Sequence, residues 1–261
     1  MRMASIRPIL PLSAVIHSQS YNHAVTIRSG HYTFHPFYFL GHDITNSTPT
    51  IDFTRPRGHC TIALTFDDGP WIYTHKLLDT LAEYDAVATF FLNGINKGNI
   101  TFYPDVLHRA VAEGHQLGSH TWSHQSLDAL DHSSIISQMT MLEDEFLQIL
   151  GYFPFYMRLP YLVSNDAVLA AMAELGYYVI GVSIDTKDYE NDDPGLIWKS
   201  FEKFRLELDV GGSIVLAHDV HMNTVEILVE NMLKEIRSRG LKAVTIGECL
   251  GDPVENWYRS S

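Results

Sequence analysis

Short runs of apolar and β-branched residues alternate with longer amphipathic segments along most of the chain. The strand-like runs are residues 61–66, 88–92, 116–118, 156–158, 177–184, 213–217 and 242–246. Between them, apolar residues recur at helical spacing in segments such as 74–84, 104–113, 134–150, 166–175 and 224–239. Most of these segments are followed by a glycine at a position typical of a helix end: Gly114, Gly151, Gly176 and Gly240.

A regular succession of strands and helices predicts an α/β fold in which helices cover a parallel sheet. Roughly 250 residues are typical of a (β/α) barrel, and this chain has 261, but it offers seven strands instead of eight. We therefore predict a distorted (β/α) barrel of seven parallel strands with outer helices, formed by residues 60–261. Residues 1–59 show no sustained period, and we expect an irregular N-terminal arm, or a signal or pro segment.

The charge of the chain argues against some partners. Lys and Arg total 18 against 31 Asp and Glu, which gives a net charge of −13. Phosphate backbones and anionic membrane surfaces repel such a chain, so we expect no nucleic-acid partner. No run reaches the ~18 apolar residues that a membrane helix requires, so we expect no membrane span. We expect a monomer.

Polar residues follow five of the predicted strands at the point where each strand ends. They are Asp67 and Asp68, His120 and His124, Arg158, Asp185, and His218 with Asp219. Active sites of parallel α/β folds form at this edge of the sheet, where these residues would meet. A polar residue at one strand end is often only a helix cap, but five such ends favour a site.

The residue types at these positions suggest a metal-dependent hydrolase. One carboxylate and two imidazoles can hold a divalent ion with open positions, and the second carboxylate of Asp67 and Asp68 is left to act as a base. Asp-Asp-Gly is also ordinary turn chemistry, and a chain with 14 histidines contains accidental pairs. The same ligand set serves non-haem iron oxygenases, but the second aspartate and a third histidine, His218, favour hydrolysis.

These motifs resemble a known family. Residues 65–70 (Thr-Phe-Asp-Asp-Gly-Pro) and 119–124 (Ser-His-Thr-Trp-Ser-His) are similar to the first two motifs of the polysaccharide deacetylases with the NodB homology domain, carbohydrate esterase family 4. Residues 158–161, 185–189 and 216–219 are similar to the third, fourth and fifth motifs. The resemblance covers residues 60–259, and the tail from residue 247 looks like fungal chitin deacetylases.

The resemblance implies a catalytic role for four of the matched residues. Asp67 would be the general base, oriented by Arg158. His218 would be the general acid, oriented by Asp185. Such a pair supplies what amide hydrolysis requires, because the water must lose a proton and the departing amine must gain one.

The resemblance also implies ligands for the metal and for the substrate. The metal ligands would be Asp68, His120 and His124, with Zn²⁺ the expected ion and Co²⁺ or another divalent ion the alternative. Tyr161 would offer its backbone N–H to the oxyanion, and Leu216 would line the pocket for the acetyl methyl group. Tyr189 would contact substrate at a position where many bacterial members have Trp.

The substrate implied by the resemblance is chitin or chitooligosaccharide, whose N-acetylglucosamine units would lose acetate to give a chitosan-type product. Two alternatives stay open at this point. The substrate could be another acetylated polysaccharide, such as xylan or peptidoglycan. The chain could also be a non-catalytic carbohydrate-binding relative, although its retained Asp67 and His218 argue against this.

Cys60 and Cys249 flank the first and last predicted strands, which are neighbours in a barrel. We predict a disulfide between them, which would stabilise the fold by roughly 5 kcal/mol on the chain-entropy model; the alternative is two reduced thiols. A disulfide and the sequons at Asn46 and Asn99 suggest a secreted or cell-wall protein. The N-terminus has no clearly recognisable signal peptide, because Pro8 interrupts its short apolar run.

Overall fold

The computed structural model describes residues 24–28, 31–35, 39–40 and 61–260. Within the predicted arm it gives the strands β1 (Ala24–Arg28), β2 (His31–His35) and β3 (Phe39–Leu40). β1 and β2 pair antiparallel, and β3 pairs antiparallel with β9. Most of the predicted arm lies outside the described residues, so the division into an arm and a domain remains a prediction.

All seven predicted strand runs form a parallel sheet, which confirms the predicted α/β fold. Its strands are β4 (Thr61–Asp67), β5 (Thr89–Leu92), β6 (Gln116–Ser119), β8 (Tyr156–Met157), β9 (Tyr178–Ile180), β10 (Ile184–Asp185), β11 (Ile214–His218) and β12 (Lys242–Val244). Hydrogen bonds join them in the order β10-β11-β4-β5-β6-β8-β9, and β12 pairs with β4. A separate antiparallel pair is formed by β7 (Phe153–Pro154) and β13 (Tyr258–Arg259).

The predicted run 177–184 is divided into two short strands, and it joins both ends of the parallel series. β9 pairs with β8, whereas β10 pairs with β11 at the other end. Between them, the carbonyls of Ile180 and Gly181 accept hydrogen bonds from the Arg158 side chain, both at 3.3 Å. The run therefore leaves regular strand geometry at the point where its carbonyls bind this arginine.

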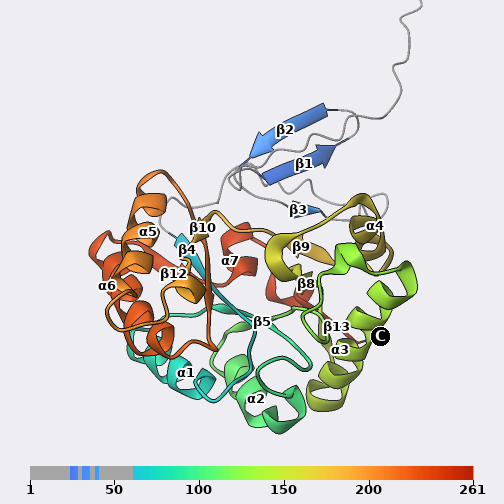
Figure 1. The fold of residues 1–261 in the computed structure, drawn as a ribbon, viewed down its shortest axis with the longest axis horizontal. Helices are drawn as coiled ribbons and strands as arrows, with labels where there is room; N and C mark the ends of the chain where they lie inside the picture. Colours follow the sequence, from blue (N-terminus) through green and yellow to red (C-terminus); the bar gives the residue numbers. More distant parts are fainter. Residues whose placement is uncertain (1–23, 29–30, 36–38, 41–60, 261) are drawn as a thin grey trace, which may run out of the picture.

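Helices α1 to α6 lie around the outside of the sheet, and the short α7 lies near the centre of the view in Figure 1. They are α1 (Thr74–Glu83), α2 (Pro104–Ala112), α3 (His132–Leu150), α4 (Asp166–Glu174), α5 (Trp198–Asp209), α6 (Val229–Ser238) and α7 (Ile246–Leu250). Short 3₁₀ turns are η1 (Ile100–Phe102), η2 (Leu127–Ala129), η3 (Pro160–Leu162), η4 (Asp188–Glu190) and η6 (Val254–Asn256), and η5 (Thr224–Leu228) is a π-helix.

Five predicted helical segments are confirmed, although the segment 224–239 is divided into η5 and α6. The helical segments predicted from the sequence do not include α5 or α7. The four glycines have positive φ angles between 69° and 86°, a conformation that other residues adopt only with strain, and this explains why the preceding helices end there.

β4 shows how the sequence places the site inside the barrel. Leu64 and Phe66 are fully buried in the cluster that includes Leu77 and Leu81 of α1. Alternate residues of a strand point to opposite faces, so Thr65 and Asp67 face the barrel interior. The apolar half of this strand stabilises the sheet–helix contact, and its polar half is left for chemistry.

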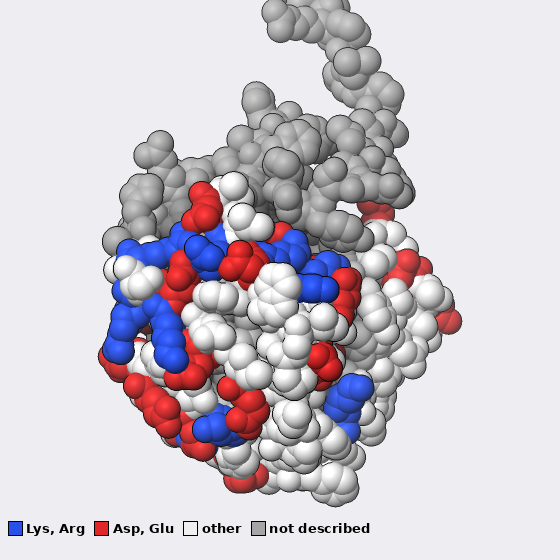
Figure 2. Space-filling model, turned by 60° about the vertical axis from the view of Figure 1, so that its left-hand side comes forward, with Lys and Arg blue, Asp and Glu red and all other residues white. Residues whose placement is uncertain are grey.

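Charged residues on the outer helices are paired rather than gathered by sign. Figure 2 shows Lys and Arg interspersed with Asp and Glu on the face that carries α5 and α6. The pairs include Lys234–Glu230 at 2.8 Å and Arg205–Glu202 at 2.9 Å. In the part of the chain that the structure describes, no helix is long and apolar enough to cross a membrane.

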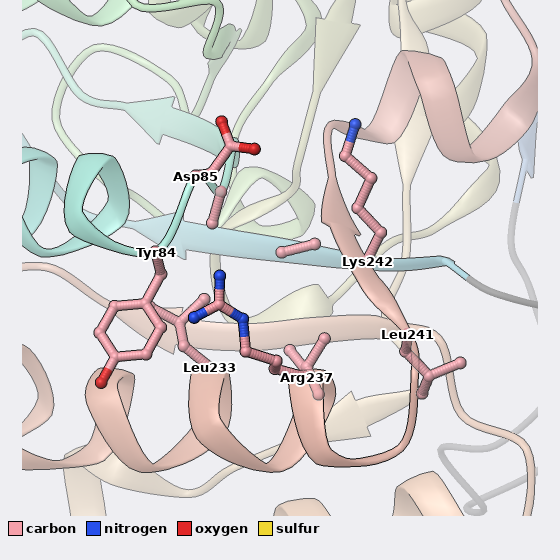
Figure 3. A pocket seen from close by; sticks show the side chains of 9 residues that line it. Tyr84, Asp85, Leu233, Arg237, Leu241 and Lys242 are labelled. Atoms are coloured by element: carbon pink, nitrogen blue, oxygen red, sulfur yellow. The ribbon is translucent and has the colours of Figure 1, made fainter.

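A pocket of ≈200 Å³ lies near the N-terminal ends of β5 and β12, beside the last turns of α1 and α6. Figure 3 shows Tyr84 and Arg237 on its helical side and Lys242 on its strand side. Its lining has no histidine and one carboxylate, Asp85, so it lacks the groups that metal binding requires.

The predicted disulfide is not seen. Cys249 is buried and forms no disulfide with any described residue, and burial raises the pKa of its thiol to about 11. Its predicted partner, Cys60, lies outside the described residues.

Candidate active site

The loops that follow the parallel strands enclose a cavity of ≈570 Å³ at their carboxyl ends. Nine of the predicted site residues line it: Asp67, Asp68, His120, His124, Tyr161, Asp185, Tyr189, Leu216 and His218. Arg158 is fully buried beneath it. The structure therefore brings every predicted catalytic, metal-binding and substrate-binding residue to one place.

Asp68, His120 and His124 form a cluster that can hold a metal ion. Their ligand atoms all lie within 4.8 Å of one another, and no other group of this kind occurs among the described residues. Asp68 Oδ1 lies 3.7 Å from His120 Nε2 and 3.1 Å from His124 Nε2. This buried oxygen has no hydrogen-bond partner among the described residues, an arrangement that fits a cation held between the three side chains.

His120 is prepared for metal binding by its surroundings. Its Nδ1 lies 2.8 Å from the carbonyl oxygen of Arg158, which can only accept, so Nδ1 carries the proton and Nε2 is free. Burial lowers the pKa of His120 to about 3, which keeps the imidazole neutral. A neutral imidazole with a hydrogen-bonded second nitrogen is the usual form of a histidine ligand.

Asp67 and Arg158 form a buried ion pair. The Arg158 guanidinium donates from Nη1 to Asp67 Oδ1 at 2.8 Å and to Thr65 Oγ1 at 2.6 Å, and it lies 4.3 Å from the centre of the Phe91 ring. Burial raises the pKa of Asp67 above its usual value, although Arg158 opposes the shift. A carboxylate that is fixed in place and more basic than usual is suited to accept a proton from water.

The structure corrects the predicted partner of His218, which is Asp188 and not Asp185. His218 Nδ1 lies 2.8 Å from Asp188 Oδ1, and the His218 backbone N–H donates to Asp188 Oδ2 at 2.7 Å. Asp185 is the last residue of β10 and does not reach His218. Its carboxylate instead accepts a hydrogen bond from the Lys187 backbone N–H at 3.1 Å. The turn η4, which follows β10, brings Asp188 beneath His218.

The fully buried Asp188 carboxylate is completely hydrogen-bonded. Besides the two bonds from His218, it accepts from the Tyr189 backbone N–H at 3.1 Å and from Thr224 Oγ1 at 2.9 Å. Burial opposes ionisation, but His218 and these donors hold the pKa of Asp188 below its usual value. Burial would likewise lower the pKa of His218, but the charge of Asp188 outweighs it and raises that pKa to about 10. His218 is therefore an imidazolium that can donate a proton.

Asp185 and Tyr189 form one wall of the cavity together with Lys187. The Lys187 ammonium lies 3.2 Å from Asp185 Oδ2 and also bonds to the Tyr189 hydroxyl. The Tyr189 ring packs edge-on against His218, with ring centres 5.3 Å apart. Tyr189 thus covers the acid side of the site with a ring whose hydroxyl is held by its neighbours.

Tyr161 and Leu216 both line the cavity. The Tyr161 ring packs against His124 at 4.7 Å between centres, and its side chain is largely exposed. Leu216 on β11 is nearly buried in the cavity lining and provides an apolar surface next to His218. Their roles toward substrate remain predictions.

Strained backbone is concentrated around this cavity. Seven described non-glycine residues have positive φ, and six of them lie in the site loops: Asp68, Thr121, His124, Tyr161, Leu162 and Lys187. Such conformations cost of order 1–3 kcal/mol each and persist where the surrounding structure holds them. Their positions mark these loops as functional.

Asp219 follows β11, and the sequence assigns no role to it. It is fully buried, accepts from Thr74 Oγ1 at 2.5 Å, and has one oxygen without a partner among the described residues. Thr74 Oγ1 in turn accepts from the Trp71 backbone N–H at 2.9 Å. A Cβ on Gly69 would lie only 2.3 Å from Asp219, so the loop that carries Asp68 packs directly on this carboxylate.

Residues 54–180 of the chain match the polysaccharide deacetylase family. A chitin deacetylase from Colletotrichum lindemuthianum is 45% identical over 82% of this chain and 87% of its own length. The chain belongs to the polysaccharide deacetylase family.

A solved structure of the chitin deacetylase from Colletotrichum lindemuthianum superposes with a TM-score of 0.74, covering 77% of this chain and 94% of that one. Two proteins of Arthroderma benhamiae are similar at the level of sequence. One, named chitin deacetylase, is 51% identical over 80% of this chain. The other, named probable peptidoglycan-N-acetylglucosamine deacetylase, is 50% identical over 82% of it. The chain spans 58% and 51% of these two relatives, respectively.

Proposed function

We propose that this protein is a metal-dependent chitin deacetylase, which hydrolyses N-acetyl groups of chitin or chitooligosaccharides to acetate and free amines. The observation that carries the proposal is a buried carboxylate and an imidazolium at neighbouring positions in the lining of one cavity. Asp67 and His218 are paired in register on the adjacent strands β4 and β11. Between them they supply the base and the acid that amide hydrolysis requires.

Asp68, His120 and His124 would hold the metal ion, for which Zn²⁺ suits two imidazoles and one carboxylate and Co²⁺ is the alternative. The ion would supply Lewis-acid activation of the water and of the acetamide carbonyl. Asp67, held by Arg158, accepts the proton of the attacking water. His218, held by Asp188, donates a proton to the nitrogen that departs as the amine.

Two further residues position the acetyl group in this proposal. Leu216 offers an apolar surface to the methyl group, and the Tyr161 backbone N–H faces the oxyanion. The register between β4 and β11 pairs Leu216 with Thr65, and each lies two residues before the acid His218 or the base Asp67 on its strand. This position supports a methyl group lying deeper in the cavity than the reacting carbonyl.

The charge of the cavity supports a neutral polymer as the substrate. Its two lysines are each bonded to a neighbouring carboxylate, Lys187 to Asp185 and Lys203 to Glu207. The described lining therefore offers no free lysine to an anionic wall polymer. The net charge of −13 further disfavours such a polymer at low salt.

The test is acetate release by the zinc-loaded protein from chitin oligosaccharides, acetylated xylan and peptidoglycan under one condition. We expect the highest rate with chitin oligosaccharides. A higher rate with xylan or peptidoglycan would replace the substrate and keep the mechanism. No acetate from any of the three, after chelation and metal addition, would favour a non-catalytic carbohydrate-binding protein.

We further propose that the protein acts outside the cell or in the cell wall, where chitin is found, and that Cys60 and Cys249 are bonded there. Cys249 follows β12, which pairs with β4, and Cys60 directly precedes β4 in the sequence. This arrangement supports the pairing. Peptide mass mapping without reductant should show one linked pair. Two free thiols in protein made under oxidising conditions would contradict the disulfide.

A further inference from the structure

A second histidine–aspartate pair lies beside His218 in the same cavity. His221 Nδ1 is 3.2 Å from Asp192 Oδ2, and the rings of His218 and His221 are edge-on with centres 5.7 Å apart. His218 is the last residue of β11 and His221 lies three residues further on, whereas both aspartates lie on the segment that follows β10. The hydrolytic reaction as proposed uses only the first pair.

Asp192 is itself fixed, which fixes the imidazole of His221. Asp192 Oδ1 accepts from the backbone N–H and from the side-chain Nδ2 of Asn223, both at 2.9 Å. The side chain of Asn223 is nearly buried, so this support is not free to rotate. A carboxylate can only accept, so it holds a proton on His221 Nδ1 and leaves Nε2 for another partner.

His221 is accessible from the cavity, which it lines with a side chain 21% exposed. No hydrogen bond to its Nε2 occurs within the described residues. The ring of His221 lies close to the ring of His218, the proposed acid. A substrate group bound at His221 would therefore lie close to the acetamide under attack. In a neutral polysaccharide, the groups at such a place are ring hydroxyls.

We propose that His221 is a substrate-positioning residue whose Nε2 hydrogen-bonds a sugar hydroxyl next to the acetamide, with Asp192 and Asn223 holding the ring. A hydroxyl both donates and accepts, so it can pair with Nε2 of either the neutral or the protonated imidazole. The inference rests on the proposed function, because it names the sugar contact of that site. Its consequence is selectivity for an acetamide presented on a hydroxylated ring.

The first experiment is steady-state acetate release from chitin pentaose by zinc-loaded wild type, His221→Ala and His221→Gln. One hydrogen bond is worth roughly 0.5–1.5 kcal/mol, so we expect His221→Ala to raise KM about 3- to 10-fold with little change in kcat. His221→Gln can restore part of the KM through its amide. The control is Met222→Ala, an exposed neighbour that does not line the cavity and should match wild type.

The second experiment measures binding without turnover. In an Asp67→Asn background, calorimetry with chitin pentaose should show weaker binding, by a similar factor, when His221→Ala is added. Equal affinity of the two proteins would overturn the inference, as would a loss confined to kcat, which indicates proton transfer. Acetate release by wild type is read separately: if it is absent while pentaose binding depends on His221, the proposed function fails and the contact stands.

Discussion

Replacing Asp188 with asparagine tests the acid half of the site. The charge of Asp188 is what raises the pKa of His218 from the ordinary 6.5 to about 10, against the opposing effect of burial. Without that charge the pKa of His218 should fall, because burial would then be opposed only by the smaller effects of Asp68 and Asp67. Since the protonated imidazole is the acid, activity that persists in wild type until the pH approaches 10 should decline at a lower pH in the variant.

The magnitude follows from the same contacts. Above its lowered pKa the variant would lose the imidazolium, and loss of a general acid costs typically ~10²- to 10⁴-fold in rate. Breaking a buried ion pair also destabilises the fold by about 3–5 kcal/mol. A raised folded-state pKa gives His218 a stabilising contribution that is complete below pH 6.5 and lost as the pH rises through about 10.

The assay is kcat/KM for a chitin oligosaccharide between pH 5 and 10.5, paired with urea unfolding at both ends of the range. Asp185→Asn is the matched control, because Asp185 lies on the same segment but does not contact His218. We expect its alkaline limb to coincide with that of wild type. An unshifted limb in Asp188→Asn, or a shift in Asp185→Asn instead, would refute the assignment of Asp188 as the partner.

Three further variants test the metal side of the site and its packing. His120→Ala should lose both metal and acetate release, whereas Asp67→Asn should keep the metal and lose ~10²- to 10⁴-fold in rate, and metal analysis beside the acetate assay separates them; equal metal loss would contradict the division of roles. Gly69→Ala should lower the free energy of unfolding by about 1–3 kcal/mol in thermal or urea unfolding, because its Cβ would clash with buried Asp219. Gly195→Ala, whose Cβ would meet only Asp193 at 3.1 Å, is its control and should change little.

The strands, most helices and the position of the site could be predicted from the sequence, because they depend on local periodicity and on where strands end. α5 was not named although its buried residues Ser200, Phe204 and Leu208 recur every four positions. That stripe contains one serine among many charged residues, and the apolar signal is correspondingly weak. The helix is fixed by its packing against β10 and α6 rather than by a strong pattern of its own.

The partner of His218 could not be predicted from the residues alone. Asp185 and Asp188 are three residues apart, and only the path of η4 decides which carboxylate reaches the imidazole. His221 and Asp192 carry the same lesson, since each is an ordinary polar residue in a loop until the two loops are placed side by side. Tertiary geometry selects among residues that the sequence leaves equivalent.

Arg158 serves two structures at once. Its Nη1 holds Asp67, while its Nε and Nη2 satisfy the carbonyls of Ile180 and Gly181 at the point where the barrel departs from regular pairing. A relative that lost catalysis through a change at His218 would still need this arginine to complete its fold. Arginine at this position is therefore weak evidence of activity when relatives are compared, and the histidine at position 218 is the better guide.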